Sequence, residues 1–395
     1  MSAGMLFKKF SVRLGEFLEP FVQPLPPAPA RVVRELVAGT VFTGSIQLTN
    51  AARLFARTSR QLERAVERMS QHLADPHWDH RPLQTVLLDQ QAQELDDDTL
   101  IAIDLTDLAK PYARHMEHLA IVRDASDLKT RRVPGYWCFQ AYRFDADREH
   151  LAPMMVFPFS QNQPEFRSEN QVLREAFWPI RQATGGRGVW VMDRGFDRRE
   201  VIEPLLRLKV RWIIRQRGDR HLIGPDGSVR STREWADCAL KTRSERGRAV
   251  TLPVRLTWNP TPLWLVVPTW QPPGGDRQIL LSRGLIDQRC GPRQVRHDYA
   301  YRWRAEDGAR FFGQVFHFER FLVRRFVAIY RTVLIAAVAF SFLSELLADT
   351  DPLADLAMNR VLRWKTEWQI PVYRLAAGIR ALAAEAGIAT IANNA

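Results

Sequence analysis

Acidic residues follow two short apolar runs of this sequence. Asp104 lies near the end of the run "TLIAID", and Asp193 directly follows "GVWVM". Both runs are typical of buried strands. In a twisted α/β sheet, residues at strand ends face the crevice where ligands bind, so neighbouring strands would bring these carboxylates together. Two buried like charges raise each other's pKa unless a cation lies between them, and Mg²⁺ prefers such oxygen ligands.

A third acid lies in the segment "YAYRWRAEDGARFFGQ". Tyr299, Arg302 and Glu306 are spaced by three and four residues, which places them on one face of a helix. A helix directed at the same crevice would add Glu306 as a third carboxylate, with Tyr299 and Arg302 beside it to hold phosphates. The alternative is an ordinary surface pair between Arg302 and Glu306, worth about 0.2–0.5 kcal/mol.

Another acid, Asp197, lies four residues after Asp193 in "DRGFDRRE". It precedes the helical pattern "RREVIEPLLRLK", at a place where an N-cap side chain is expected. Gly195, between the two acids, allows the backbone to turn sharply. We therefore assign Asp193 to chemistry and Asp197 to helix capping.

The elements that must position these residues follow an α/β order. Strands are predicted over residues 99–108, 135–144, 151–159, 188–193 and 210–216. A capping box of Ser168 and Gln171 opens a helix that ends near residue 183, and another helix follows Asp197. This order predicts a mixed sheet flanked by helices. Strand-like runs separated by Pro and Gly turns indicate a β-rich insertion over 218–285, before a helical C-terminal part.

The N-terminal part suggests helices with a basic face. A proline cluster at Gln23–Arg31 predicts a loop. Thr49 or Asn50 would cap a first helix, and a capping box of Thr58 and Gln61 opens a second. The second helix carries an arginine stripe, which is how a helix-turn-helix contacts DNA; its members are Arg60, Arg64 and Arg68. The alternative is an amphipathic helix with a solvated charged face.

The composition favours a polyanionic partner inside the cell. The formal net charge is +12 and the pI is about 10.1, and Arg supplies most of the positive charge. An ordinary basic soluble protein is the alternative. The three cysteines form no CxxC or Cys/His cluster, so neither a zinc site nor a disulfide framework is indicated. The apolar segment Thr332–Ala348 is short for a membrane span and is predicted to be a buried helix, so we expect no membrane partner.

Taken together, these residues resemble the DDE transposases of bacterial insertion sequences. The resemblance is to the branch with a Y-x2-R-x3-E-x6-K signature and a β-rich insertion before the last catalytic helix. It covers about residues 95 to 345 and is carried by "IAIDLTDLAKP" at 101–111, "VMDRGFD" at 191–197, and Tyr299, Arg302 and Glu306.

The resemblance implies a fold and a division of the chain. The fold is a ribonuclease H-like α/β core with a β-rich insertion and helical N- and C-terminal regions. The expected parts are a DNA-binding helical region, the first part of the core, the insertion, the rest of the core with the Glu306 helix, and a C-terminal helical region; their bounds are 1–92, 93–217, 218–285, 286–348 and 349–395.

The resemblance also implies an activity. Asp104, Asp193 and Glu306 would hold two Mg²⁺ (or Mn²⁺) ions, one activating water or a DNA 3′-hydroxyl and the other stabilising the leaving oxygen. The partners would be double-stranded DNA, namely the terminal inverted repeats and the target, and a second copy of the chain in a synaptic homodimer. Tyr299 and Arg302 would bind phosphates. The expected location is the bacterial cytoplasm, with the nucleoid.

One position departs from the family signature. The family lysine would fall at Gly313, and Arg310, three residues earlier, is the candidate to replace it at DNA. This departure keeps two alternatives open: an inactive or repurposed ribonuclease H-like DNA-binding protein, and a related DNA nuclease. Tryptophans of the insertion could stack on an unpaired base or pack in its core; they are Trp258, Trp264 and Trp270.

Overall fold

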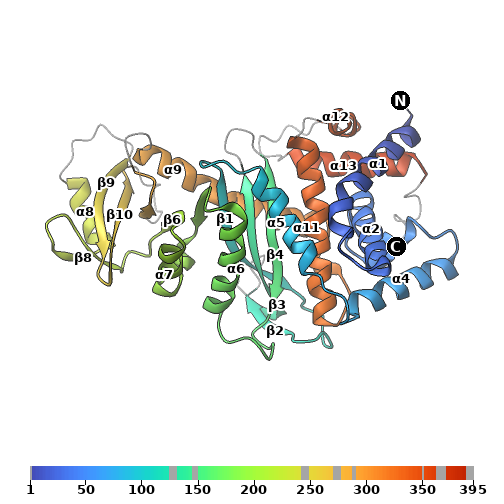
Figure 1. Cartoon of the computed structure of the whole chain (residues 1–395), viewed down its shortest axis with the longest axis horizontal. Coiled ribbons are helices and arrows are strands. Elements are labelled where there is room, and N and C mark those ends of the chain that lie inside the picture. Colours follow the sequence, from blue (N-terminus) through green and yellow to red (C-terminus); the bar gives the residue numbers. More distant parts are fainter. Residues whose placement is uncertain are drawn as a thin grey trace.

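The computed structural model describes residues 2–123, 131–144, 150–241, 249–269, 277–286, 291–348, 351–361 and 371–387. The molecule is elongated (Figure 1). Helices from both ends of the chain gather on the right of that view, and the β-rich region lies on the left.

The described strands are β1 (Leu100–Ala109), β2 (Ala120–Arg123), β3 (Arg132–Phe144), β4 (Leu151–Phe159), β5 (Val189–Met192), β6 (Arg211–Arg215), β7 (His221–Ile223), β8 (Val229–Ser231), β9 (Ala249–Leu256), β10 (Asn259–Pro268) and β11 (Leu280–Arg283). The described helices are α1 (Ala3–Val22), α2 (Pro27–Thr43), α3 (Leu48–Arg53), α4 (Ser59–Ala74), α5 (Arg81–Gln93), α6 (Glu169–Thr184), α7 (Arg199–Leu208), α8 (Thr232–Lys241), α9 (Pro292–Ala300), α10 (Arg304–Gln314), α11 (Phe326–Ala348), α12 (Pro352–Met358) and α13 (Pro371–Glu385). Short 3-10 turns are η1 (Arg194–Phe196), η2 (Tyr301–Trp303) and η3 (Phe318–Arg320).

The core sheet has the strand order β4–β3–β1–β5–β6. β1, β5 and β6 are parallel, while β3 is antiparallel to both β1 and β4. Three antiparallel strands followed by two parallel ones, with helices between, make the ribonuclease H-like arrangement. The predicted fold class is therefore confirmed, and β2, which was not predicted, pairs with the first residues of β3.

Successive side chains of β1 are buried alternately on the two faces of this sheet. Ile101 and Ile103 pack with α6 and α7 on one face, and Leu100 and Ala102 belong to the cluster formed with α10 and α11 on the other. All four side chains are buried. Because side chains alternate along a strand, a one-residue slip of β1 would exchange these two sets, so the two cores fix its register.

The predicted insertion extends the core sheet. Its strand β11 pairs antiparallel with β6, opposing Leu281 to Ile214. The order then continues through β10, β9, β7 and β8, giving one sheet of 11 strands in the described part of the chain. The strand predictions for this region are confirmed, and α8, which packs on β8, β9 and β10, was not predicted.

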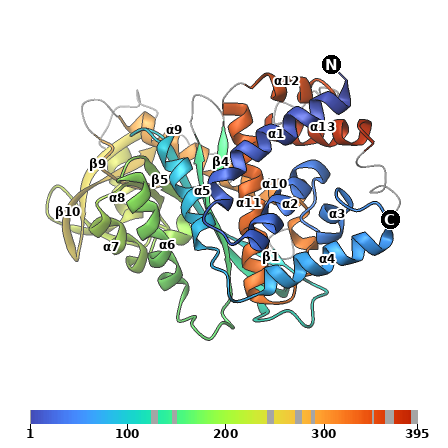
Figure 2. The same cartoon turned by 45° about the vertical axis from the view of Figure 1, so that its right-hand side comes forward.

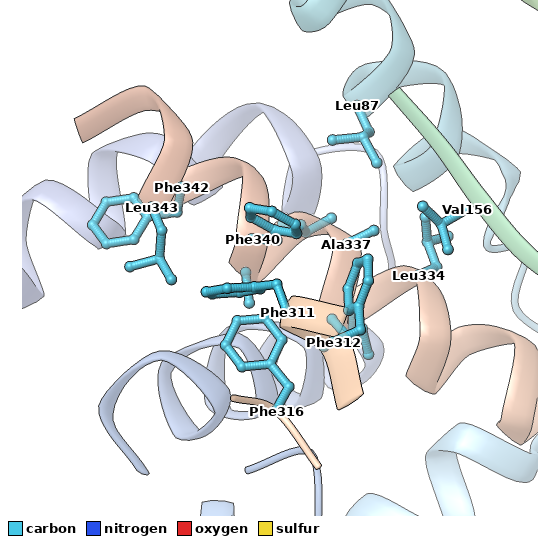
Figure 3. Close-up of a cluster of buried hydrophobic side chains, with 14 of the residues drawn as sticks. Leu87, Val156, Phe311, Phe312, Phe316, Leu334, Ala337, Phe340, Phe342 and Leu343 are labelled. Atoms are coloured by element: carbon cyan, nitrogen blue, oxygen red, sulfur yellow. The ribbon is translucent and has the colours of Figure 1, made fainter. Parts of the chain in front are cut away.

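An apolar helix, α11, forms the centre of the second core. It is long and apolar enough to cross a membrane, with a mean hydropathy of 2.1, but 89% of its apolar window is buried inside the protein. That burial confirms the predicted buried helix, which begins at Phe326 rather than at Thr332. Figure 3 shows the cluster around it, where the rings of Phe311 and Phe340 stack with centroids 4.3 Å apart. Figure 2 shows α1, α2 and α13 on the outer side of α11.

The predicted helix starts are confirmed where a side chain caps the helix. Thr58 accepts from the backbone N–H of Gln61 at 3.2 Å, and Ser168 accepts from Gln171 at 3.2 Å. The predicted cap at Thr49 or Asn50 is wrong, because α3 begins at Leu48 after Gln47. The loop predicted over Gln23–Arg31 is also wrong in its second half. α2 begins at Pro27, and proline is tolerated there because the first N–H groups of a helix lack helical partners.

A buried arginine on α11 ties the N-terminal helices to the core. Arg331 is 1% exposed, and its guanidinium donates to the carbonyls of His72, Leu73, Asp75 and Trp78 at 2.5 to 3.3 Å. The guanidinium also lies 3.9 Å from the centre of the Trp78 ring. Burial lowers the pKa of Arg331 to about 10, so it remains charged at neutral pH.

We predict that Arg331→Met lowers the free energy of unfolding by roughly 3 kcal/mol or more, because several buried carbonyls lose their donor at about 1–3 kcal/mol each. The measurement is urea unfolding followed by circular dichroism. The control is Arg325→Met, whose side chain is 70% exposed and pairs only at the surface with Glu117. Equal losses in the two variants would contradict the role of Arg331.

Candidate active site

Two carboxylates and a guanidinium lie side by side in one row across the parallel strands β1, β5 and β6. Ile103 of β1 pairs with Met192 of β5, and Met192 pairs with Ile214 of β6. The next residues along these strands are Asp104, Asp193 and Arg215. The predicted meeting of Asp104 and Asp193 therefore follows from the strand register. The prediction that Asp104 lies near the end of its strand is wrong, because β1 continues along β3 to Ala109.

The Asp193 carboxylate is held by the turn that follows it. Its Oδ1 accepts from the backbone N–H of Gly195 at 2.7 Å, which starts η1. A Cβ at position 195 would lie 2.9 Å from that Oδ1. Gly195 therefore allows a carboxylate to sit directly over the backbone turn, and a larger residue would displace it.

The Asp104 carboxylate is crowded by like charges. Burial raises the pKa of Asp104, and with the nearby Asp193 and Glu306 carboxylates it brings that pKa to about 7. The Arg302 guanidinium and the Leu105 N–H, 2.9 Å from Oδ1, act in the opposite direction. The Asp104 side chain is 22% exposed, so it remains accessible from the crevice. The site thus holds more negative charge than its own residues neutralise.

The third acid and its neighbours lie on the continuous path α9–η2–α10. Tyr299 lies in the last turn of α9 and is 5% exposed, Arg302 lies in η2, and Glu306 is in the first turn of α10. Burial raises the pKa of Tyr299 to about 12, despite the nearby Arg302 and Arg215 guanidinium groups. Tyr299 is therefore a neutral hydrogen-bond donor beside the carboxylates.

A close contact in the core sets the height of α10 above the sheet. Gly308 lies against the ring of Tyr142 on β3, where an added Cβ would be 2.5 Å from the ring. Phe311 and Phe312 on the same helix are fully buried beside α11. The glycine and the two rings anchor α10, so that Glu306 lies near Asp104 of β1.

Arg302 bridges two of the three acids. Its guanidinium lies 3.4 Å from Asp104 Oδ2 and donates to Glu306 Oε1 at 2.8 Å. Burial would lower the pKa of Arg302, but the hydrogen bond to Glu306 and the charge of Asp104 outweigh it and raise the pKa. In the described residues, no three His, Cys, Asp or Glu side chains are close enough to hold one metal ion. Arg302 thus provides positive charge where a cation could lie.

The donors present fit a hard divalent cation. Asp104 and Asp193 offer neighbouring carboxylate oxygens, and burial together with the Asp193 charge raises the pKa of Asp104, which a bound cation would offset. Glu306, with a side chain 53% exposed, is the remaining acid within electrostatic range of Asp104 on α10.

Comparison with known families supports one class of enzyme. The family described as a transposase DDE domain matches residues 162–342. The match supports a DDE transposase. It includes Asp193 and Glu306 and begins after Asp104.

One solved structure resembles this chain at low identity. A solved structure, the cryo-EM structure of the piggyBac transposase synaptic complex with hairpin DNA, is 11% identical, with a TM-score of 0.46. The alignment covers 94% of this chain and 74% of that chain. Comparison with curated proteins finds no match.

Asp197 is a structural carboxylate, as predicted, but its predicted capping role is wrong. α7 begins at Arg199 after Arg198, without a side-chain cap. Asp197 is instead buried, where it accepts from the Arg217 backbone N–H at 2.9 Å and pairs with Arg220 at 2.6 Å. The partners come from the segment after β6, which a local helix pattern does not reveal.

The residue at the family lysine position is exposed. A Cβ at Gly313, on α10, would meet nothing within 4 Å. Arg310, which we considered as a replacement for that lysine, is 54% exposed and lies 3.3 Å from the Asp307 carboxylate. Its guanidinium is therefore held on the helix by an ion pair and is open to solvent on its other side.

The arginine stripe of α4 does not join the carboxylates. α4 lies on the far side of α11 from β5 and β6 (Figures 1 and 2). Arg60 and Arg64 are exposed, whereas Arg68 is paired with Glu35 at 2.7 Å. Any DNA contact of these arginines is thus made at a separate surface.

One residue beside the carboxylates was missed in the sequence. Arg215 ends β6, next to Asp193 in the row, and is close enough to influence Tyr299. The strand-end rule that identified the two acids would also have found it. Among the tryptophans of the insertion, Trp258 and Trp264 are half-buried, and Trp270 lies outside the described residues.

We predict that Asp104→Asn stabilises the metal-free protein increasingly as the pH rises. The folded-state pKa, about 7, exceeds the ordinary value of 3.8, so the folded protein holds this proton more tightly than the unfolded chain. Deprotonation therefore costs stability between pH 4 and pH 7. With a chelator present, the melting temperature of the variant minus that of the wild type should increase as the pH rises across that window.

The matched control is Asp98→Asn, which removes an acid that is 95% exposed. Its difference from the wild type should stay nearly constant with pH. A constant difference for Asp104→Asn as well would show that the pKa of Asp104 is not raised by burial and the nearby carboxylates.

Proposed function

We propose that this protein is the transposase of a bacterial insertion sequence, which cleaves DNA at the ends of its element and joins them to a target. The observation that carries the proposal is the pairing of β1 with β5, which puts Asp104, in the middle of β1, beside Asp193, directly after β5. Arg302 and Glu306, from the path α9–η2–α10, lie next to this pair. The match of residues 162–342 to a transposase DDE domain supports the same chemistry.

In this proposal, Asp104, Asp193 and Glu306 hold the divalent cations, two Mg²⁺ or Mn²⁺. Bound cations would supply Lewis acidity at the scissile phosphate, in an in-line displacement at phosphorus. Asp193 is already oriented by Gly195, and the buried strand ends exclude water from one side of the carboxylates. Glu306 is freed for this task when Arg302 turns from it to a DNA phosphate, which forms bidentate hydrogen bonds with a guanidinium. Tyr299, neutral at physiological pH, donates a hydrogen bond to the same backbone.

The proposed partners are the terminal inverted repeats and the target DNA. Residues 1–92 would contact DNA away from the carboxylates, through Arg60 and Arg64, and the site in 93–217 and 286–348 would cut it. Residues 218–285 and 349–395 form the proposed insertion and C-terminal region. Because two element ends must be held together, the proposed assembly on DNA is a homodimer, in the bacterial cytoplasm.

We predict that Asp193→Asn abolishes Mg²⁺-dependent cleavage of DNA carrying the terminal inverted repeats, while binding to that DNA persists. The reason is that the amide cannot supply the negative oxygen that a divalent cation requires. Cleavage and binding are measured on the same purified preparations, by denaturing gel and by mobility shift.

The matched control is Asp197→Asn, the same change four residues away. Loss of the Arg220 ion pair should lower its stability, but the folded fraction should still cleave. Normal cleavage by Asp193→Asn, or none by folded Asp197→Asn, would overturn the assignment of the two acids.

The same assay separates the alternative functions. Specific binding without any cleavage by the wild type would identify a repurposed DNA-binding protein, the alternative that Gly313 favours. Cleavage without joining to a target would identify a nuclease.

A further inference from the structure

A cavity of about 180 Å³ lies between the end of β6 and the insertion. Its charged lining consists of Arg194, Arg215, Arg217, Arg233, Arg277 and Asp237. β6 and the residues after it supply Arg215 and Arg217, while α8 supplies Arg233. Arg277 precedes β11, whose Leu280 pairs with Arg215. The cavity is therefore built jointly by the core and the insertion.

The charges around this cavity are unbalanced. Its acid, Asp237, is paired with Arg277, so it does not neutralise the other arginines. In the described part of the chain, Arg215, Arg217 and Arg233 have no acidic partner within ion-pair distance. Guanidinium groups gathered without counter-charges repel one another, and a bound anion would offset that repulsion.

The local backbone keeps two of these arginines in place. Arg217 donates its Nε–H to the Arg194 carbonyl at 3.2 Å, and its backbone N–H is fixed by Asp197 at 2.9 Å. Arg233 lies against Gly218, where an added Cβ would be 3.3 Å from its Nη2. Gly218 has φ +107°, a conformation that favours glycine. The arginines are thus held at a defined concave surface, unlike long side chains free in solvent.

The cavity adjoins the carboxylate row. Arg194 directly follows Asp193, and Arg215 occupies the neighbouring position on β6. Planar guanidinium groups bind phosphate oxygens bidentately, and several together suit a monoester or diester phosphate better than the carboxylate of a small metabolite. A DNA strand whose scissile phosphate lies at Asp104 and Asp193 would bring a further phosphate to this cavity.

We infer that the cavity formed by Arg217, Arg233 and Arg277 is a phosphate-binding site, occupied by a backbone phosphate of the DNA strand that passes the carboxylates. The existence of the site stands on its geometry and charge, whereas its occupant rests on the proposed function. The insertion, in this inference, contributes a fixed grip on the DNA beside the bond to be cut.

The first arm of the test uses no DNA. Inorganic pyrophosphate in metal-free buffer should raise the melting temperature of the wild type. The double variant Arg217→Ala/Arg233→Ala, called the pocket variant below, should lose most of that increase. The control is Arg199→Ala/Arg207→Ala on the nearby α7, which removes the same charge from side chains 60% and 77% exposed. The control should respond to pyrophosphate as the wild type does.

The second arm measures the salt dependence of binding to inverted-repeat DNA. Loss of one phosphate contact should reduce the slope of log K against log salt concentration by about 0.9 for the pocket variant. The α7 control should keep the wild-type slope. Circular dichroism of all proteins confirms that each is folded before either arm is read.

The outcomes separate the two parts of the inference. A pyrophosphate response that survives in the pocket variant overturns the site. If the pocket variant loses the pyrophosphate response but keeps the wild-type salt dependence of DNA binding, a DNA phosphate is not the occupant and the site binds free phosphate. If the wild type binds no inverted-repeat DNA but the pocket variant still loses the pyrophosphate response, the phosphate site is supported and the proposed function is refuted. Loss of both responses supports the inference in full.

Discussion

Parallel pairing of β1 with β5 places Asp104 beside Asp193, and the rest of the structure accommodates that electrostatic conflict. The register cannot relax it, because a shift of one residue would turn Ile101 and Ile103 out of their core. The protein instead offsets the repulsion with hydrogen bonds from backbone N–H groups and with the Arg302 guanidinium. The raised pKa of Asp104 shows that ionising this carboxylate costs stability, and strongly shifted pKa values of this kind are common at functional sites.

The helical layer beneath the sheet determines whether a third carboxylate can reach this pair. Glu306 depends on α10, and α10 is seated by Gly308 against Tyr142 and by the phenylalanines that pack on α11. α11 in turn carries Arg331, which binds the carbonyls that end α4. A chain of packing contacts thus connects the N-terminal helices to the position of Glu306. The arginines of α4 are consequently held at a fixed place relative to the site, although they lie apart from it.

Much of the core could be predicted from the sequence, because local signals determined it. Apolar runs ending at Asp104 and Asp193 gave the strands, and the side-chain caps at Thr58 and Ser168 gave the helix starts. What could not be predicted depends on partners distant in the sequence. Asp197 is satisfied by Arg220, and the insertion continues the core sheet through β6 and β11. The bridge from Arg302 to Asp104 likewise requires the folded chain, since the spacing alone showed only its pairing with Glu306.

The central claim of the proposal is that Asp104, Asp193 and Glu306, far apart in the sequence, together hold the two divalent cations. Fe²⁺ bound in place of Mg²⁺, with ascorbate and peroxide, generates hydroxyl radicals that cut the polypeptide next to the ion. The predicted result is cleavage of the chain near all three of these residues, suppressed by excess Mg²⁺ and lost in Asp193→Asn. Cuts confined to other segments, or unchanged in that variant, would contradict the claim.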